Sequence, residues 1–153
     1  MRFETIDIDK HRNQVMEFRR DSFRVSFGNI SNFDEQDYIN WLKQKIKDFP
    51  GGFVIVEEGK KCIGQLELSI REYEGKRIGY VHLYYLIPEV RRKGKGKELN
   101  EYATRFFKEN KVSEYHLRVS PTNTTAINFY HKIGMEEAGE EMEGKVIRMK
   151  GYI

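Results

Sequence analysis

The segment best suited to chemistry is a basic, glycine-rich loop over residues 91–97, which reads Arg-Arg-Lys-Gly-Lys-Gly-Lys. It follows an apolar stretch that ends at Pro88 and precedes an expected helix. Glycines allow backbone N–H groups to converge, and the positive end of a helix dipole would point into the same space. The Lys and Arg side chains add charge to a site that already favours anions. A polyphosphate is therefore the expected ligand.

Two common phosphate-binding patterns do not match this loop. A P-loop requires Gly, four residues and then Gly-Lys-Ser/Thr, but Gly94 and Gly96 are too close together and no hydroxyl residue follows Lys97. A dinucleotide-binding fingerprint requires a third glycine where Leu99 stands. The pattern that remains is Arg91-x-x-Gly94-x-Gly96 at a strand-to-helix turn.

Hydrophobic periodicity indicates the elements that position this loop. Apolar residues at spacings of three and four predict two helices near the N-terminus, over residues 11–25 and 34–49. A third helix follows the loop, and a short fourth one ends at Gly134. The expected strands cover residues 3–8, 53–56, 63–70, 80–87, 115–119 and 146–153, with a solvated acidic hairpin over 136–143.

The element order is therefore β-α-α-β-β-β-α-β-α-β-β, which predicts an α/β (α+β) fold with a mixed sheet. Turn residues between the second, third and fourth strands indicate an antiparallel meander. Strands 80–87 and 115–119 are joined through a helix, so we expect them to be parallel neighbours.

Length and composition predict one domain over residues 1–153. Aromatic residues make up 13% of the chain, which is too many for a disordered protein. No apolar run is long enough to span a bilayer, and the charged N-terminus does not resemble a signal peptide, so we expect a cytoplasmic protein without a membrane partner. The single cysteine, Cys62, excludes an internal disulfide and a cysteine-cluster zinc site.

A second motif lies downstream and reads Asn123-x-x-Ala126-x-x-Phe129-Tyr130-x-Lys132-x-Gly134-Met135. With the loop motif before it, the chain resembles the GNAT N-acetyltransferase family and departs from the family pattern only at the last position. The resemblance implies a GNAT fold, with a mixed central sheet of about seven strands and four helices. It also implies acetyl-CoA as co-substrate, no metal, and transfer of the acetyl group to a primary amine by direct attack in a ternary complex.

The resemblance assigns cofactor contacts along both motifs. Arg91 would hold the loop, and the end of the strand at Leu86 and Ile87 would pair with pantetheine, where strands four and five splay apart in the family. The Leu86 N–H would polarise the thioester carbonyl. Asn123 would bind the pantetheine arm and Lys132 the adenosine-side phosphate. The backbone amides expected to hold the pyrophosphate belong to Arg92, Lys93, Gly94, Lys95, Gly96 and Lys97.

Within this resemblance, Tyr130 is the candidate that would protonate the leaving thiolate, although the same spacing also fits a core tyrosine. The strand before Pro88 contains no carboxylate where the family often places its general base. His82 is the first candidate for that role, with a strand histidine of no catalytic role as the alternative, and Glu67 is the second. Phe27 and Tyr38 would line the acceptor pocket.

Two other function classes stay open. The missing carboxylate is compatible with a GNAT-fold module that binds CoA without catalysis. A nucleic-acid-binding protein is disfavoured, because no aromatic residues interleave the basic loop and the net charge is only +3. The acceptor would be a small-molecule or peptide amine that the sequence does not identify, and the family resemblance also allows a homodimer.

Overall fold

The computed structural model describes residues 1–27 and 34–153, with side chains described for 1–24 and 34–153. The element order predicted from the sequence is confirmed. The strands are β1 (Arg2–Thr5), β2 (Phe53–Glu58), β3 (Lys61–Tyr73), β4 (Lys76–Leu86), β5 (Glu114–Val119), β6 (Glu136–Glu141) and β7 (Val146–Tyr152). The helices are α1 (Ile8–Phe27), α2 (Glu35–Asp48), α3 (Lys95–Glu109) and α4 (Thr124–Lys132), with a 3-10 turn, η1, over Pro88–Val90.

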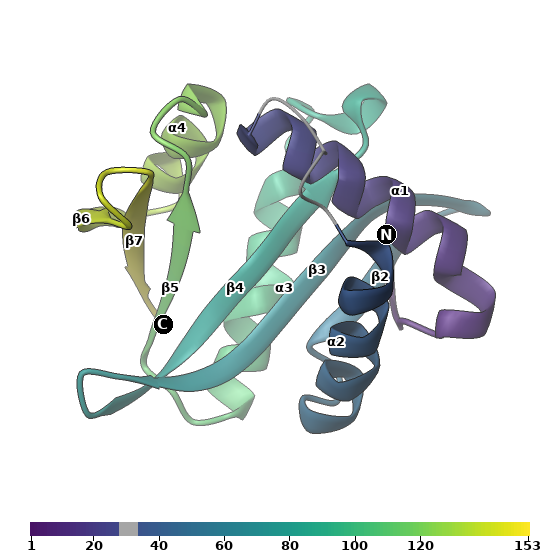
Figure 1. The fold of residues 1–153 in the computed structure, drawn as a ribbon, viewed down its shortest axis with the longest axis horizontal. Helices are drawn as coiled ribbons and strands as arrows, with labels where there is room; N and C mark the ends of the chain where they lie inside the picture. Colours follow the sequence, from purple (N-terminus) through teal and green to yellow (C-terminus); the bar gives the residue numbers. More distant parts are fainter. Residues whose placement is uncertain (28–33) are drawn as a thin grey trace.

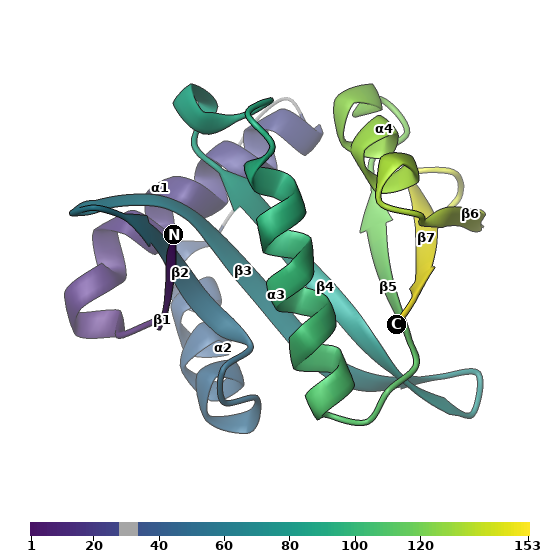
Figure 2. The same cartoon turned by 180° about the vertical axis from the view of Figure 1, so that it is seen from behind.

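The strands form one mixed sheet in the order β1-β2-β3-β4-β5-β7-β6. Among the strands of the described residues, only β4 and β5 run parallel, as their connection through α3 requires. Helices α1 and α2 cover one face of the sheet, and α3 covers the other (Figure 1, Figure 2). No helix of the described chain is long and apolar enough to cross a membrane.

Local sequence signals explain most element ends. Asp34 caps α2 by accepting a hydrogen bond from the Asp37 backbone N–H at 3.0 Å, and the helix ends before Pro50. The strand expected over residues 3–8 is too long, because Asp7 ends it: its carboxylate accepts from the backbone N–H of Asp9 at 3.0 Å and starts α1 at Ile8.

Two irregularities of β4 position the candidate site. The pairing of β4 with β5 covers only Gly79–Val81 and Tyr115–Leu117, so the two strands part beyond these residues. In the pairing with β3, Glu67 lies opposite Leu83 and Leu68 opposite Val81, which leaves His82 as the extra residue of a β-bulge. The C-terminal half of β4 therefore has an edge that β5 does not pair.

The hairpin expected over residues 136–143 is too short: the acidic segment forms one strand, β6, at the end of the sheet, and its partner in the hairpin is β7. Four of the six residues of β6 are glutamates, and nearly all of the strand is exposed. The register with β7 shifts between Glu137 and Gly139.

Candidate active site

The basic loop places two residues in the left-handed backbone region directly before α3. Arg92 has a φ of 63°, and Gly94, which caps the helix, has a φ of 79°. Such turns direct successive backbone N–H groups to one point, and the N-terminus of α3 adds its own free amides there. A Cβ at Gly94 would meet no atom within 4 Å, so the space beside the turn is open. This geometry suits a pyrophosphate.

Arg91 holds the start of the loop in place. Its Nε donates to the Leu86 carbonyl at 2.7 Å, and its Nη2 donates to Asp21 of α1 at 3.1 Å. The Tyr85 hydroxyl donates to the same carboxylate oxygen at 2.5 Å. Arg91 therefore joins the end of β4 to α1.

The basic side chains of the loop divide into two groups. Lys95 is paired with Glu58 at 2.6 Å. Within the described chain, Arg92, Lys93 and Lys97 are exposed and form no ion pair or hydrogen bond, so their charges are free for a ligand. Lys132, at the end of α4, is also exposed and unpaired among the described residues.

The edge of β4 presents a backbone donor beside this loop. The Ile87 N–H donates to the Ile63 carbonyl of β3 at 2.8 Å, so it is already used inside the sheet. Because successive residues of a strand turn their N–H groups to opposite sides, the N–H of Leu86 lies on the other edge, where β5 has already separated. Of the two residues expected to pair with pantetheine, Leu86 has the geometry for a backbone contact.

Helix α4 carries the second motif. The side chain of Asn123 accepts from the Ala126 backbone N–H at 3.2 Å and caps the helix, which leaves its amide N–H₂ group for a ligand. Tyr130 packs beside Tyr84 with ring centroids 6.2 Å apart. Burial raises the pKa of the Tyr130 phenol, so it stays protonated, and its hydroxyl makes no hydrogen bond within the described chain.

Gly96 is required by packing within the protein. A Cβ at this position would lie 2.8 Å from Cε1 and 2.9 Å from Cζ of Phe129. The first turn of α3 thus fits against α4 only because residue 96 has no side chain. This contact places Tyr130 and the loop at a fixed separation.

On the opposite face of the sheet, Glu67 is fully buried below α1 and α2. Its Oε2 accepts hydrogen bonds from the Tyr38 hydroxyl and, at 2.8 Å, from Gln65. Its Oε1 has no hydrogen bond among the described residues, and Arg19 Nη1 lies 3.4 Å away. Burial raises the pKa of this carboxyl, and Arg19 opposes the shift. Tyr38, expected in the acceptor pocket, therefore positions Glu67.

His82 lies at the bulge, 2.7 Å from the Ser69 hydroxyl through its Nε2. Burial and the positive charges of Arg71, Arg19 and Lys45 lower its pKa to about 3, so the ring is neutral at physiological pH. It can accept or donate a hydrogen bond, but it is a weak base. Phe27, also expected in the acceptor pocket, ends α1, and its side chain lies outside the described residues.

Sequence reasoning missed a polar network on β5, β6 and β7. His116 is buried between Glu114, at 2.6 Å from its Nε2, and Arg148, at 2.9 Å from its Nδ1. Arg148 and Arg118 both donate to Glu141, each at 2.9 Å. The alternation of Glu114, His116 and Arg118 with apolar residues was the available signal, because it marks one polar face of β5.

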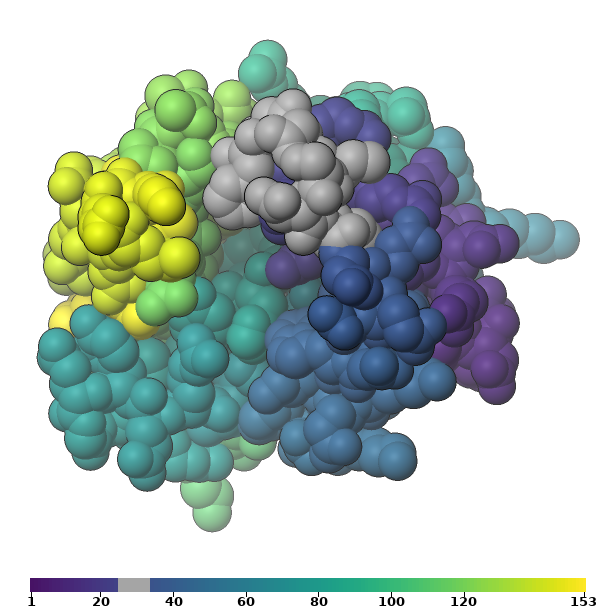
Figure 3. Space-filling view, in the orientation of Figure 1, coloured from purple at the N-terminus to yellow at the C-terminus, as the bar shows by residue number. Residues whose placement is uncertain are grey.

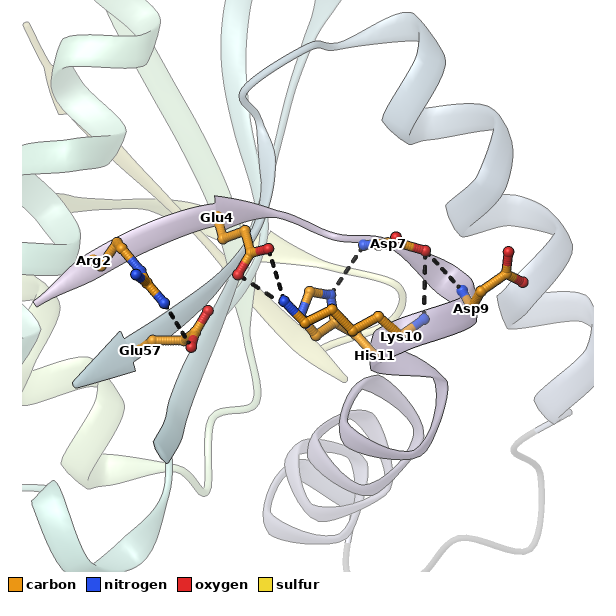
Figure 4. Close-up of polar contacts among 7 residues, drawn as sticks. All are labelled: Arg2, Glu4, Asp7, Asp9, Lys10, His11 and Glu57. Atoms are coloured by element: carbon orange, nitrogen blue, oxygen red, sulfur yellow. Dashed lines mark hydrogen bonds and ion pairs between the residues drawn. The ribbon is translucent and has the colours of Figure 1, made fainter. Parts of the chain in front are cut away.

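A histidine and two carboxylates also meet near the N-terminus. One oxygen each of Glu4 and Glu57 and a nitrogen of His11 lie within 4.8 Å of one another (Figure 4). The Asp7 backbone N–H donates to His11 Nδ1 at 3.0 Å, so a neutral ring carries its proton on Nε2, the nitrogen that faces Glu4. A metal would have to bind the Nε2 lone pair, whose place the proton takes. The cluster therefore does not suit a metal.

Comparison with known proteins agrees with this geometry. The acetyltransferase (GNAT) family matches residues 12–135. An uncharacterized N-acetyltransferase of Archaeoglobus fulgidus is 29% identical over 100 residues, covering 63% of this chain and 66% of that protein. Another from Methanocaldococcus jannaschii is 28% identical over 103 residues, covering 65% of this chain and 44% of that protein. The match thus spans less than two thirds of either relative.

Among solved structures, the PaiA N-acetyltransferase from Thermoplasma acidophilum in complex with coenzyme A has the same fold, with a TM-score of 0.74 and 20% identity over 99% of this chain and 98% of that chain. The predicted mixed sheet with four helices is confirmed. From the match over most of its length, the chain belongs to the acetyltransferase (GNAT) family.

Proposed function

We propose that this protein transfers an acetyl group from acetyl-CoA to a primary amine, by direct attack of the amine on the thioester in a ternary complex. The observation that carries the proposal is the amide-lined turn at Arg92 and Gly94, which leads into α3 beside the unpaired edge of β4. The anion site would bind the pyrophosphate of the ligand, and the free strand edge beside it would bind the amide-containing arm. We also propose that the reaction takes place in the cytoplasm.

The residues present fit acetyl-CoA. The amides of residues 92–97 would hold the pyrophosphate, with the free charges of Lys93 and Lys97 beside it. The Leu86 N–H would bind the arm at the edge of β4, and Asn123 would contact it from α4. Acetyl-CoA supplies the activated acetyl group, and the protein's task is to orient it and to move protons.

Tyr130 is the proposed acid. Its pKa is raised, so the phenol holds its proton at neutral pH. Its hydroxyl is free of other partners in the described chain and can donate to a leaving thiolate. Its fixed distance from the loop, set by the contact between Gly96 and Phe129, would keep it beside the sulfur.

Glu67 is the proposed base, ahead of His82. The attacking amine must lose a proton, and a base works best when its pKa is close to the working pH. Burial moves the pKa of Glu67 upward, toward that range, whereas the pKa of His82 is about 3. The Tyr38 hydroxyl, hydrogen-bonded to Glu67, would relay the proton, and neutral His82 would orient the acceptor.

Calorimetry with acetyl-CoA and with CoA, at two salt concentrations, tests the cofactor site. We expect saturable one-to-one binding that becomes about 100-fold weaker when Lys93 and Lys97 are both replaced by Ala, as expected for the loss of two charge-assisted contacts of about tenfold each. The matched control replaces Lys43 and Lys47, exposed residues of α2, and should bind normally. A screen of amines with detection of released thiol then tests transfer.

Each alternative predicts a different result. A CoA-binding module without catalysis would bind acetyl-CoA and release no thiol with any amine. A nucleic-acid-binding protein would fail to bind acetyl-CoA and would bind DNA or RNA with a steep salt dependence. Failure to bind acetyl-CoA at either salt concentration would overturn the proposed function.

A further inference from the structure

An unpaired arginine lies on the face of the sheet that carries Glu67 and His82. Arg71 of β3 is exposed, and its guanidinium carbon lies 4.3 Å from the centroid of the Tyr80 ring. Within the described chain it forms no hydrogen bond and no ion pair with a carboxylate. The cation stacks on the ring but is not neutralised.

Two more arginines act electrostatically on the same tyrosine, although the guanidinium of Arg148 itself stacks on the Tyr73 ring, 4.0 Å from its centroid. The positive charges of Arg118 and Arg148 act on the Tyr80 phenol together with that of Arg71, and Glu141 is the acidic group that opposes them. The Glu141 carboxylate is already shared by Arg118 and Arg148, and they lower its pKa, so it stays ionised. Arg118 and Arg148 are thus each paired with Glu141, and Arg71 is the one of the three arginines that forms no ion pair among the described residues.

The position of Arg71 relative to the proposed base, Glu67, follows from the alternation of side chains along β3. Glu67, Ser69 and Arg71 alternate along β3 and share one face, so Arg71 is about 7 Å along the strand from Ser69 and about 14 Å from Glu67. Ser69 contacts His82, and the charge of Arg71 contributes to the lowered pKa of that histidine. The positive charge of Arg71 therefore acts on His82, the residue proposed to orient the acceptor.

The molecule has a hollow on the side of the sheet that α1 and α2 cover. Figure 3 shows a depression between α2 and the C-terminal strands, with part of the β3–β4 region at its floor. Helices α1 and α2 cover β2 to β4 on this face and leave the side toward β5 and β7 uncovered (Figure 1). Strands β3 and β4, which carry Arg71 and Tyr80, contribute to the floor of this depression.

We propose that the acceptor is a primary amine that also carries an anionic group, a carboxylate or a phosphate, and that Arg71 binds this group. The proposal rests on the proposed function and names the substrate class of the same site. A guanidinium can bind either anion through two parallel hydrogen bonds. A polycationic amine would meet uncompensated like charge at the same place and would be disfavoured.

Matched pairs of acceptors test this inference. One arm uses short peptides with a free N-terminus that differ only by Asp or Asn at the second, third or fourth residue. A second arm uses ω-amino carboxylates and ω-amino phosphates of increasing length, each with its uncharged amide or alcohol. Released thiol is measured at saturating acetyl-CoA, and spermidine serves as the polycationic comparison.

We expect the anionic member of at least one pair to have a kcat/KM about tenfold higher than its neutral partner, as for one charge-assisted contact. In Arg71→Gln the two members should become equal, mainly through a higher KM for the anionic one, and Arg71→Lys should restore part of the preference. Arg105→Gln, which removes the same charge from exposed Arg105 on α3, should keep the full preference.

The outcomes separate this inference from the proposed function. Equal use of both members in every pair, or a preference for spermidine, overturns the anionic acceptor but leaves the transferase in place. Acetyl-CoA binding without transfer to any member of the panel also overturns it. A preference that survives in Arg71→Gln assigns anion binding to another residue and overturns the role of Arg71.

Discussion

Replacing Gly96 with Ala should disturb the contact between α3 and α4. The added methyl group would lie 2.8 and 2.9 Å from two carbons of the Phe129 ring, closer than such atoms approach, so the ring or its helix must move. Overpacking costs about 1–3 kcal/mol, and the better helix propensity of Ala returns about 1 kcal/mol. We therefore expect a net destabilisation of about 0–2 kcal/mol, equivalent to a fall in Tm of up to about 8 °C for a chain of this size.

The larger effect should be kinetic. Phe129 is the neighbour of Tyr130, so a shift of α4 moves the proposed acid away from the loop that holds acetyl-CoA. Displacing a catalytic group by about 1 Å can cost about 100-fold in rate. We expect kcat to fall by about 10- to 100-fold, whereas the affinity for acetyl-CoA measured by calorimetry should change little.

A double variant identifies the cause. Combining Gly96→Ala with Phe129→Leu removes the outer ring carbons and makes room for the methyl group, so the double variant should recover stability and kcat relative to the sum of the single changes. Gly75→Ala is the control, because its methyl group would meet no atom and its cost comes from the backbone φ of 77° at a residue outside the loop. The reasoning is wrong if Gly96→Ala mainly weakens acetyl-CoA binding and Phe129→Leu does not relieve the defect. In that case Gly96 makes room for the ligand.

Three further results are expected. Tyr130→Phe should lower kcat by about 10²- to 10⁴-fold with little change in KM for acetyl-CoA or in Tm, as for loss of a general acid; an unchanged kcat would assign protonation of the thiolate to solvent. Glu67→Gln should lower kcat/KM and abolish its rise with pH through the raised pKa of the Glu67 carboxyl, whereas a pH–rate profile identical to the native one would exclude Glu67 as base. The pKa of His82 is about 3 in the folded protein, below its ordinary 6.5. Its neutral ring therefore makes its full contribution to stability above pH 6.5, and this contribution is lost as the pH falls toward 3. The native protein should lose about 2 kcal/mol more than His82→Gln between pH 7 and pH 5 in chemical unfolding, and equal losses would show that His82 is not held neutral in the fold.

The sequence predicts the elements of this fold better than the contacts between them. The cap at Asp34 and the stop at Pro50 are local signals, and the structure confirms the helix between them. The parallel pairing of β4 and β5 follows from their connection through a helix, which is a rule of topology.

Contacts between distant segments could not be predicted in this way. Tyr38 meets Glu67 only because α2 packs on β3, and no periodicity shows which residues of a helix and a strand face each other. The bulge at His82 depends on the register of two strands, and alternation in one strand does not fix that register. The roles proposed for Tyr130, Glu67 and the loop therefore stay predictions for experiment.

The exposed edge of β6 limits how two copies of the chain can associate. An unpaired edge strand offers N–H and C=O groups that can pair with the same edge of another molecule. Here that edge carries Glu136, Glu137, Glu140 and Glu141, so pairing two such edges would bring eight carboxyl groups together. The register shift beside Gly139 further interrupts the regular row of donors and acceptors. A homodimer built by extending the sheet across β6 is thus disfavoured, and any self-association would use another surface.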